Sequence, residues 1–75
     1  MEKNITAIMP GLVARTEVNE GDKVEEGQVV AVINCMKTEI NVTTDQPGTV
    51  TQILVKEWDE VQVGNPMVVI EVNDG

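Results

Sequence analysis

The stretch "PGLVARTEVNEGDKVEEGQVVAVI" (residues 10–33) returns 37 residues later as "PGTVTQILVKEWDEVQVGNPMVVI" (residues 47–70). Ten of the 24 aligned positions are identical, and the alignment needs no gap. Each copy reads as one supersecondary unit that cannot bury its apolar face alone, so two copies must pack together. We therefore predict a single domain over residues 1–75, built from quasi-repeats at residues 5–36 and 42–73.

The residue composition favours strands over helices. Fourteen valines and six isoleucines stand against two leucines, with no Phe or Tyr. β-Branched side chains pack well on a pleated surface and lose side-chain freedom in a helix. Apolar and polar residues also alternate in part, which favours strands; Ala31, Ile33 and Cys35 fall on one face. We expect an all-β fold, a flattened barrel or sandwich of two antiparallel sheets with internal twofold pseudosymmetry.

Turn residues punctuate both copies at matching places. Each copy reads as strand, Pro-Gly turn, strand, acidic turn, short strand, glycine turn and strand. Pro followed by Gly suits the central positions of a type II turn, because Pro fixes φ near −65° and Gly accepts the positive φ that follows. This reading predicts a positive φ at Gly48 and at its counterpart Gly11.

The run "NCMKTEI" (residues 34–40) links two valine-rich segments and reads as a tight hairpin centred on Met36 and Lys37. A two-residue loop of type I′ needs positive φ at both central positions, which favours Asn-Gly and disfavours Met-Lys. We interpret the unfavourable pair as local strain tolerated at a functional site. Under the repeat, residues 34–36 superpose on 71–73, so the hairpin tip and the chain termini should lie at opposite ends of the domain.

Composition and charge exclude several functional classes. One cysteine and no histidine rule out an internal disulfide, a Cys/His zinc site and a His-activated nucleophile, so neither catalytic nor metal-ligating residues are expected. Thirteen acidic against five basic residues give a net charge of −8, which opposes nucleic-acid binding and favours a monomer. The N-terminus lacks a basic region followed by a long apolar stretch, and no run reaches membrane-spanning length. We expect a soluble cytoplasmic protein without a membrane partner.

Four segments together carry a resemblance to a known family: "IMPGLV", "VNEGDKVEEGQVV", "MKTEI" and "PGTVTQILV". With them the chain resembles a biotinyl/lipoyl attachment domain, the carrier module of biotin-dependent carboxylases and 2-oxo acid dehydrogenases. The resemblance implies a barrel-sandwich hybrid of two four-stranded sheets. It also implies that the ε-amino group of Lys37 is joined covalently to biotin or lipoate.

Residues beside Lys37 bear on which cofactor is attached. The common biotinyl pattern is Glu-Ala-Met-Lys-Met, whereas this chain has Asn34, Cys35, Met36, Lys37 and Thr38. Met36 matches the methionine that a biotin ligase would read, and Thr38 stands where the second methionine is missing. Lipoyl domains more often have Asp-Lys-Ala at the site. Biotin on Lys37 is therefore preferred, with Met36 and Thr38 as ligase-recognition residues and lipoate on the same lysine as the alternative.

The implied function is that of a non-catalytic, free-standing carrier, similar to a biotin carboxyl carrier. It would be modified by a biotin protein ligase and would shuttle carboxybiotin between a biotin carboxylase and a carboxyltransferase. The alternatives are a lipoyl carrier served by a lipoate ligase, and an unmodified β interaction module. A lysine suits the carrier role because it has a four-carbon stem and a nucleophilic amine.

Cys35 and Trp58 each have a structural and a functional interpretation. Cys35 lies on the apolar side of the alternation and reads as a small buried hydrophobe. Trp58 replaces Gly21 of the first copy at an acidic turn. A partly covered surface packing residue is the favoured interpretation of Trp58, and a docking role is the alternative.

Overall fold

The computed structural model describes residues 1–72 and confirms the all-β prediction. Within these residues there are eight strands: β1 (Glu2–Thr6), β2 (Gly11–Thr16), β3 (Lys23–Val24), β4 (Val29–Cys35), β5 (Thr38–Thr43), β6 (Gly48–Ile53), β7 (Glu60–Val61) and β8 (Pro66–Val72). Residue 73, the end of the second quasi-repeat, lies outside the described residues. In the part of the chain that the structure describes, no helix is long and apolar enough to cross a membrane.

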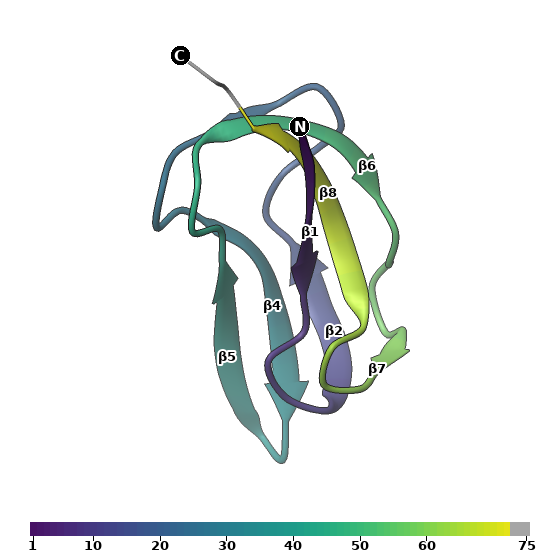
Figure 1. Cartoon of the computed structure of the whole chain (residues 1–75). Helices are drawn as coiled ribbons and strands as arrows, with labels where there is room; N and C mark the ends of the chain where they lie inside the picture. Colours follow the sequence, from purple (N-terminus) through teal and green to yellow (C-terminus); the bar gives the residue numbers. More distant parts are fainter. Residues whose placement is uncertain (73–75) are drawn as a thin grey trace.

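The strands form two four-stranded antiparallel sheets, in the orders β1-β8-β6-β3 and β5-β4-β2-β7 (Figure 1). A shift of 37 residues carries β2, β3 and β4 onto β6, β7 and β8, and the same shift converts one sheet order into the other. Each sheet takes strands from both halves, because the short strands β3 and β7 pair with β6 and β2 of the opposite half. The predicted sandwich with internal twofold pseudosymmetry is confirmed.

The core lies between the two sheets and repeats with the chain. Ile33 and Ile70 are fully buried, and so are Val13 and Val50 at one repeat distance from each other. Because strand side chains alternate between faces, each copy contributes one apolar face to this interior. Other buried members of the core are Ile5, Ala7, Val18, Val24, Val30, Ala31, Val42, Val61, Met67, Val68 and Val72.

The acidic turns are held by hydrogen bonds that also repeat. The carboxylate of Asp22 accepts a hydrogen bond from the backbone N–H of Asn19 at 2.8 Å, and Asp59 accepts one from Lys56 at 2.9 Å. Asp side chains commonly close turns in this way, by binding nearby backbone groups. The backbone of each turn then bonds across to the other half, with Val50 N–H donating to the Asp22 carbonyl at 2.8 Å.

The type II turn prediction at the Pro-Gly pairs is wrong. Gly48 has no positive φ, and the φ of Gly11 is 159°, far from the value of about +80° that a type II turn requires. Both glycines begin strands, after bends at residues 8–9 and 45–46. The glycines are needed for close approach instead. A Cβ on Gly11 would lie 2.6 Å from the Asn34 carbonyl oxygen, and a Cβ on Gly48 would collide with the Glu71 carbonyl oxygen. Asn34 and Glu71 are also one repeat apart, so the packed fold imposes the same close approach to a carbonyl on the glycine of each half.

Among the described residues, the hairpin tip lies at the end of the domain opposite to Met1 and Val72, in agreement with the prediction. Figure 1 shows the β4–β5 hairpin pointing to one end and the N-terminus at the other. The last described residue, Val72, lies beside the start of the chain, because its backbone N–H donates to the Met1 carbonyl at 2.8 Å.

Candidate functional site

The hairpin tip adopts the strained geometry that the sequence suggested. Met36 has φ 50° and Lys37 has φ 70°, both in the left-handed region. Each such residue other than glycine costs about 1–2 kcal/mol relative to right-handed backbone. Strain of this kind persists only where the surrounding structure enforces it. Here the six paired positions between β4 and β5, ending with Cys35 opposite Thr38, hold the chain in this turn.

The tip presents its side chains to solvent. Met36 is 92% exposed, and Lys37 and Thr38 are exposed as well. Among residues 1–72, the Lys37 Nζ has no hydrogen-bond or ion-pair partner, whereas the Lys3 Nζ lies 2.7 Å from an Asp45 oxygen. The structure therefore brings the three predicted site residues together and leaves the Lys37 amine accessible. The described residues contain no cluster of acidic or cysteine side chains that could hold a metal ion.

A charged network beside the tip involves residues that the sequence did not single out. Arg15 Nη1 donates to Glu39 Oε2 at 3.2 Å, and Arg15 Nε donates to Glu17 Oε1 at 2.8 Å. The hydrogen bond that Arg15 donates to Glu39, and next the one that it donates to Glu17, raise the pKa of Arg15. Glu39 lies two residues after Lys37, but its carboxylate is bound to Arg15. No local pattern could reveal this pairing, because Arg15 and Glu39 are 24 residues apart in the sequence.

Cys35 differs from its predicted environment, and Trp58 has an unusual backbone conformation. Cys35 is half-buried instead of buried, because it ends β4 directly before the exposed turn. Trp58 is 62% exposed and has φ 75°, at the position where its counterpart Gly21 has φ 93°. An exposure of this size agrees with the favoured interpretation, a surface residue that is only partly covered. A bulky side chain in the left-handed region is a rare arrangement.

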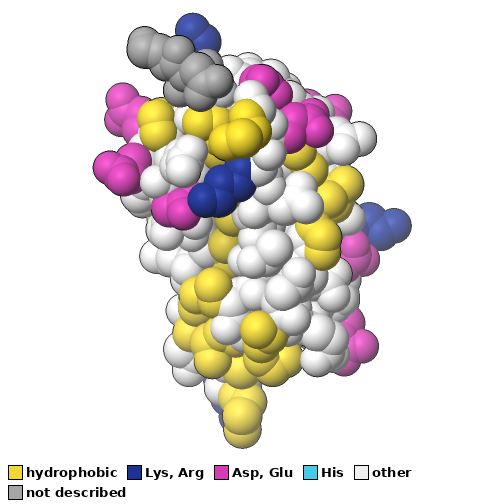
Figure 2. Space-filling model, viewed as in Figure 1, with side chains coloured by type: hydrophobic (Ala, Val, Ile, Leu, Met, Phe, Trp, Pro, Cys, Tyr) yellow, Lys and Arg dark blue, Asp and Glu magenta, His cyan; other side chains and the backbone are white. Residues whose placement is uncertain are grey.

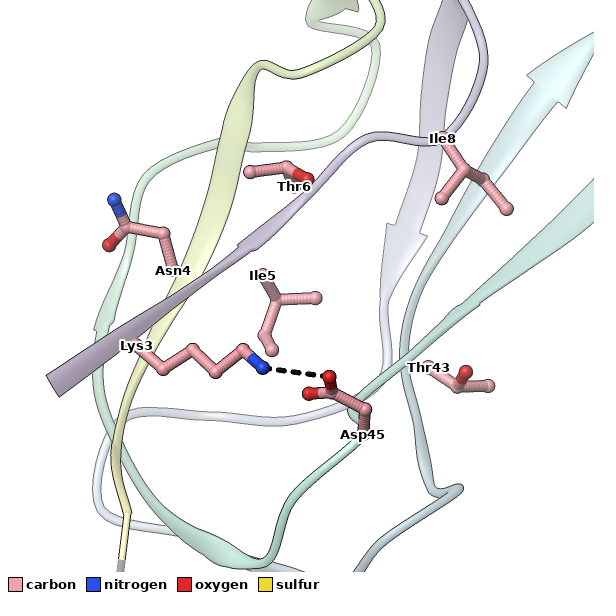
Figure 3. A pocket seen from close by; sticks show the side chains of 7 residues that line it. All are labelled: Lys3, Asn4, Ile5, Thr6, Ile8, Thr43 and Asp45. Atoms are coloured by element: carbon pink, nitrogen blue, oxygen red, sulfur yellow. Dashed lines mark hydrogen bonds and ion pairs between the residues drawn. The ribbon is translucent and has the colours of Figure 1, made fainter.

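A hollow of about 230 Å³ separates the edge strands β1 and β5. Figure 3 shows Lys3 reaching across it from β1 to Asp45, with Ile5 and Thr43 beside the pair. The hydrogen bond from Lys3 lowers the pKa of Asp45. Asp45 follows the end of β5 that is opposite to the tip, so this ion pair links the two sheets away from the candidate site.

Charge is unevenly distributed around the tip. Residues 7–14, 29–36 and 61–70 contain no charged side chain, although the chain has a net charge of −8. Figure 2 shows a cluster of hydrophobic side chains near the tip and further hydrophobic side chains toward the opposite end of the visible face. Exposed apolar patches of this sort commonly mark contact surfaces. Lys37 thus has uncharged segments close to it, in addition to the Arg15–Glu39 pair described above.

Comparison with known proteins gives consistent matches. A family model described as "Biotin-requiring enzyme" matches residues 3–70. The 2-oxoglutarate carboxylase large subunit of Hydrogenobacter thermophilus is 62% identical over 34 residues, which are 45% of this chain and 5% of that subunit.

Solved structures show the same fold. The crystal structure of Kluyveromyces lactis urea carboxylase matches with a TM-score of 0.89 and 32% identity, over 95% of this chain and 6% of that one. A single-chain, multi-domain long-chain acyl-CoA carboxylase matches with a TM-score of 0.89 and 23% identity, over 97% of this chain and 7% of that one.

The chain therefore corresponds to a small part, 5% to 7%, of these relatives. The match to the second structure shows the fold alone, whereas the family match covers nearly the whole chain. On the strength of that match, with the two-sheet architecture and the hairpin geometry beside it, the chain belongs to the family of biotin/lipoyl attachment domains.

Proposed function

We propose that Lys37 is the residue acylated by biotin, and that the domain carries the attached group between a biotin carboxylase and a carboxyltransferase. The observation that carries the proposal is the backbone of the tip, where Met36 and Lys37 both have positive φ. Lys37 is exposed at this turn, and its amine has no partner among residues 1–72. An exposed amine on a rigid hairpin fits the attachment of a long flexible group.

Acylation of Lys37 requires only its own amine and an activated acyl donor supplied by a ligase. The unprotonated Nζ attacks the acyl carbon, an amide bond forms, the activating group leaves with its bonding electrons, and the nitrogen releases a proton. Biotin, when attached, supplies a nitrogen that accepts and returns a carboxyl group. The β4–β5 ladder keeps the base of the arm fixed, and the lysine stem adds reach. Tethering raises the local concentration of the group at a docked active site to about the millimolar range.

Biotin is the preferred group because of Met36 and because the relatives described above are named as carboxylases. Met36 offers a flexible, polarizable apolar contact beside the lysine. Lipoate on Lys37 is the alternative chemistry for the same architecture, and an unmodified interaction module is the alternative of another class.

The deciding experiment is intact mass spectrometry of the protein purified from its native host. We expect a mass increase equal to one biotinyl group, located on Lys37 by peptide fragmentation. Lys37→Arg should abolish the increase, and Lys56→Arg, which changes another exposed turn lysine, should leave it unchanged. A mass increase equal to one lipoyl group on Lys37 would identify lipoate, instead of biotin, as the attached cofactor. An unmodified Lys37 would favour the interaction module.

Ligase recognition has its own test at the neighbouring side chains. Met36→Asp should lower the initial rate of biotin transfer by a purified biotin ligase, because it replaces an apolar contact with a charge. Thr38→Met should raise that rate, because it restores the methionine pair of the common biotinyl pattern. If Met36→Asp left the rate unchanged, the recognition role of Met36 would be wrong.

A further inference from the structure

A groove of about 510 Å³ lies directly beside the tip. It is formed by the start of β2, the end of β4 and the short strand β7, and it is lined by Pro10, Gly11, Leu12, Asn34, Cys35, Met36 and Glu60. Strands of both halves are needed to build it, since β7 belongs to the second half. Of its lining residues, only Met36 has a role in the proposed attachment.

The centre of the groove is a row of three side chains across the sheet. Leu12 pairs with Asn34 of β4 on one side and with Glu60 of β7 on the other. Directly paired residues on neighbouring strands project from the same face of a sheet. Leu12 is 42% exposed and its neighbour Val13 is buried, so the row lies on the outer face. An apolar side chain is thus flanked by an amide and a carboxylate.

The groove begins where the Lys37 arm begins. Met36, one of its lining residues, directly precedes Lys37, and the intervening backbone is the fixed turn described above. Acylation also converts the charged ammonium into a neutral amide, which removes the group that holds the free lysine in water. A neutral, largely apolar arm attached at this point has apolar surface within reach.

We propose, resting on the proposed function of Lys37, that this groove is a resting site for the ring of the attached arm and selects a bicyclic ureido ring. The aliphatic part of the ring packs on Leu12 and Met36. The carboxylate of Glu60 accepts a hydrogen bond from a ureido N–H, and the amide of Asn34 donates to the ureido carbonyl. A dithiolane ring has neither the N–H donors nor the carbonyl, so it gains only the apolar contact.

The groove needs only a low affinity for the ring. With an effective concentration in the millimolar range, a groove that binds the free ring with Kd of about 1 mM holds the tethered ring roughly half of the time. Binding this weak still lets the arm leave for a partner active site. A resting site of this strength keeps the ring out of water between transfers without trapping it.

The first test uses the unmodified full chain and biocytin, which is biotin joined to free lysine. We expect saturable shifts of the Leu12 and Met36 methyl signals in NMR spectra, with Kd of about millimolar order. Leu12→Gln should weaken binding by roughly fivefold or more, because about half of a leucine side chain loses its apolar contact. Leu54→Gln is the matched control, since Leu54 is 47% exposed and does not line the groove.

The polar selection is tested in the same titration. Glu60→Ala should weaken biocytin binding and leave the weaker binding of lipoyl-lysine unchanged. Shifts that are absent, or that respond equally to Leu12→Gln and Leu54→Gln, would overturn the resting site. If Glu60→Ala weakened the binding of biocytin and lipoyl-lysine equally, the preference of the groove for a ureido ring would be overturned.

The second test uses the chain biotinylated on Lys37. We expect nuclear Overhauser contacts between the ring protons and the Leu12 methyl groups, and their loss in Leu12→Gln. Biotinylated Lys37 with no such contacts would overturn the resting site and leave the proposed function standing. If biocytin bound at Leu12 but no ligase modified Lys37, the proposed attachment would be overturned. The groove would still be supported as a ring-binding site.

Discussion

The two halves of the molecule share one strand pattern but end differently. In the first half, β4 runs through Met36 and Lys37 directly into β5. In the second half, β8 ends beside the start of β1, with Val72 bonded to Met1. One end of a pseudosymmetric domain is therefore a closed, strained turn, and the other is where the described chain starts and stops. Lys37 is therefore set apart by the turn on which it lies, because the strands around it have counterparts in the other half.

A second difference concerns the acidic turns. The N–H of Gly21 donates to Val50, and the N–H of Trp58 donates to Val13, so the two turns have equivalent backbones. Both residues have positive φ, which glycine adopts freely and tryptophan does not. The fold demands the same conformation twice, and only one half supplies the residue that adopts it without strain.

The largest expected effect on stability comes from substituting the glycine that begins β6 or its counterpart at the start of β2. Gly48→Val should destabilise the protein by about 3 kcal/mol or more, because the new Cβ collides with the Glu71 carbonyl. Gly11→Val should cost a similar amount at the equivalent contact with Asn34. Gly64→Ala, which has positive φ but open space around it, should cost only about 1 kcal/mol. Urea unfolding midpoints measure all three, and a Gly48→Val midpoint near that of the wild type would refute the close-approach argument.

Next in size is the strain at the tip, which has no counterpart at the other end. Replacing Met36 by Asn and Lys37 by Gly should stabilise the protein by about 1–2 kcal/mol, because this pair adopts a type I′ turn readily. Met36→Ala keeps the strain and should show no gain. The free energy of unfolding from urea titrations separates the variants. If the double variant were no more stable than the wild type, the tip would not be strained in the way its φ angles indicate.

A smaller effect on stability is expected from exchanging the residue types at the two acidic turns, Trp58 and Gly21. Trp58→Gly should stabilise the protein by about 0.5–1 kcal/mol, since relief of left-handed strain exceeds the extra entropy cost of glycine. Gly21→Trp, the reverse exchange in the first half, should destabilise it by a similar amount. Thermal unfolding of both variants gives the comparison. A loss of stability in Trp58→Gly would mean that packing of the indole outweighs the backbone strain.

The smallest effect concerns the ion pair between the edge strands. Because Lys3 lowers the pKa of Asp45 in the folded state, the unfolded chain binds a proton more readily, and the pair stabilises the fold above the unfolded pKa. This contribution should disappear as the pH falls from about 4 through the lowered folded pKa. Lys3→Met should therefore flatten the decline of the urea midpoint in acid, and more so at low salt. Identical pH profiles for both proteins would contradict this linkage.

Much of the fold was predictable because the determining signals are local or repeated. β-Branched composition predicted strands, the gapless repeat predicted two equivalent units, and Asp22 and Asp59 close turns through their own neighbours. The positive φ values of the hairpin were also predictable, since a two-residue loop restricts its own backbone. The attachment role of Lys37 stays a prediction that the mass measurement will decide.

What failed, or could not be predicted, depends on contacts between distant segments. The Pro-Gly pairs looked like type II turns, but Gly48 is selected by the carbonyl of Glu71, which is 23 residues away. The pairing of Arg15 with Glu39 also joins separate strands. Residue spacing along the chain carries no information about such distances, because the packing of the sheets determines them.

By itself, then, the sequence determined the order and type of the strands, the duplicated core and the position of Lys37 at a hairpin tip, because each depends on local backbone preference or on repetition. Only the tertiary structure decided that β7 crosses to β2 of the other half and places Glu60 beside Leu12. The physical reason is that pairing between halves depends on how two apolar faces close over one core, and no residue near Leu12 in the chain encodes which strand will lie next to it.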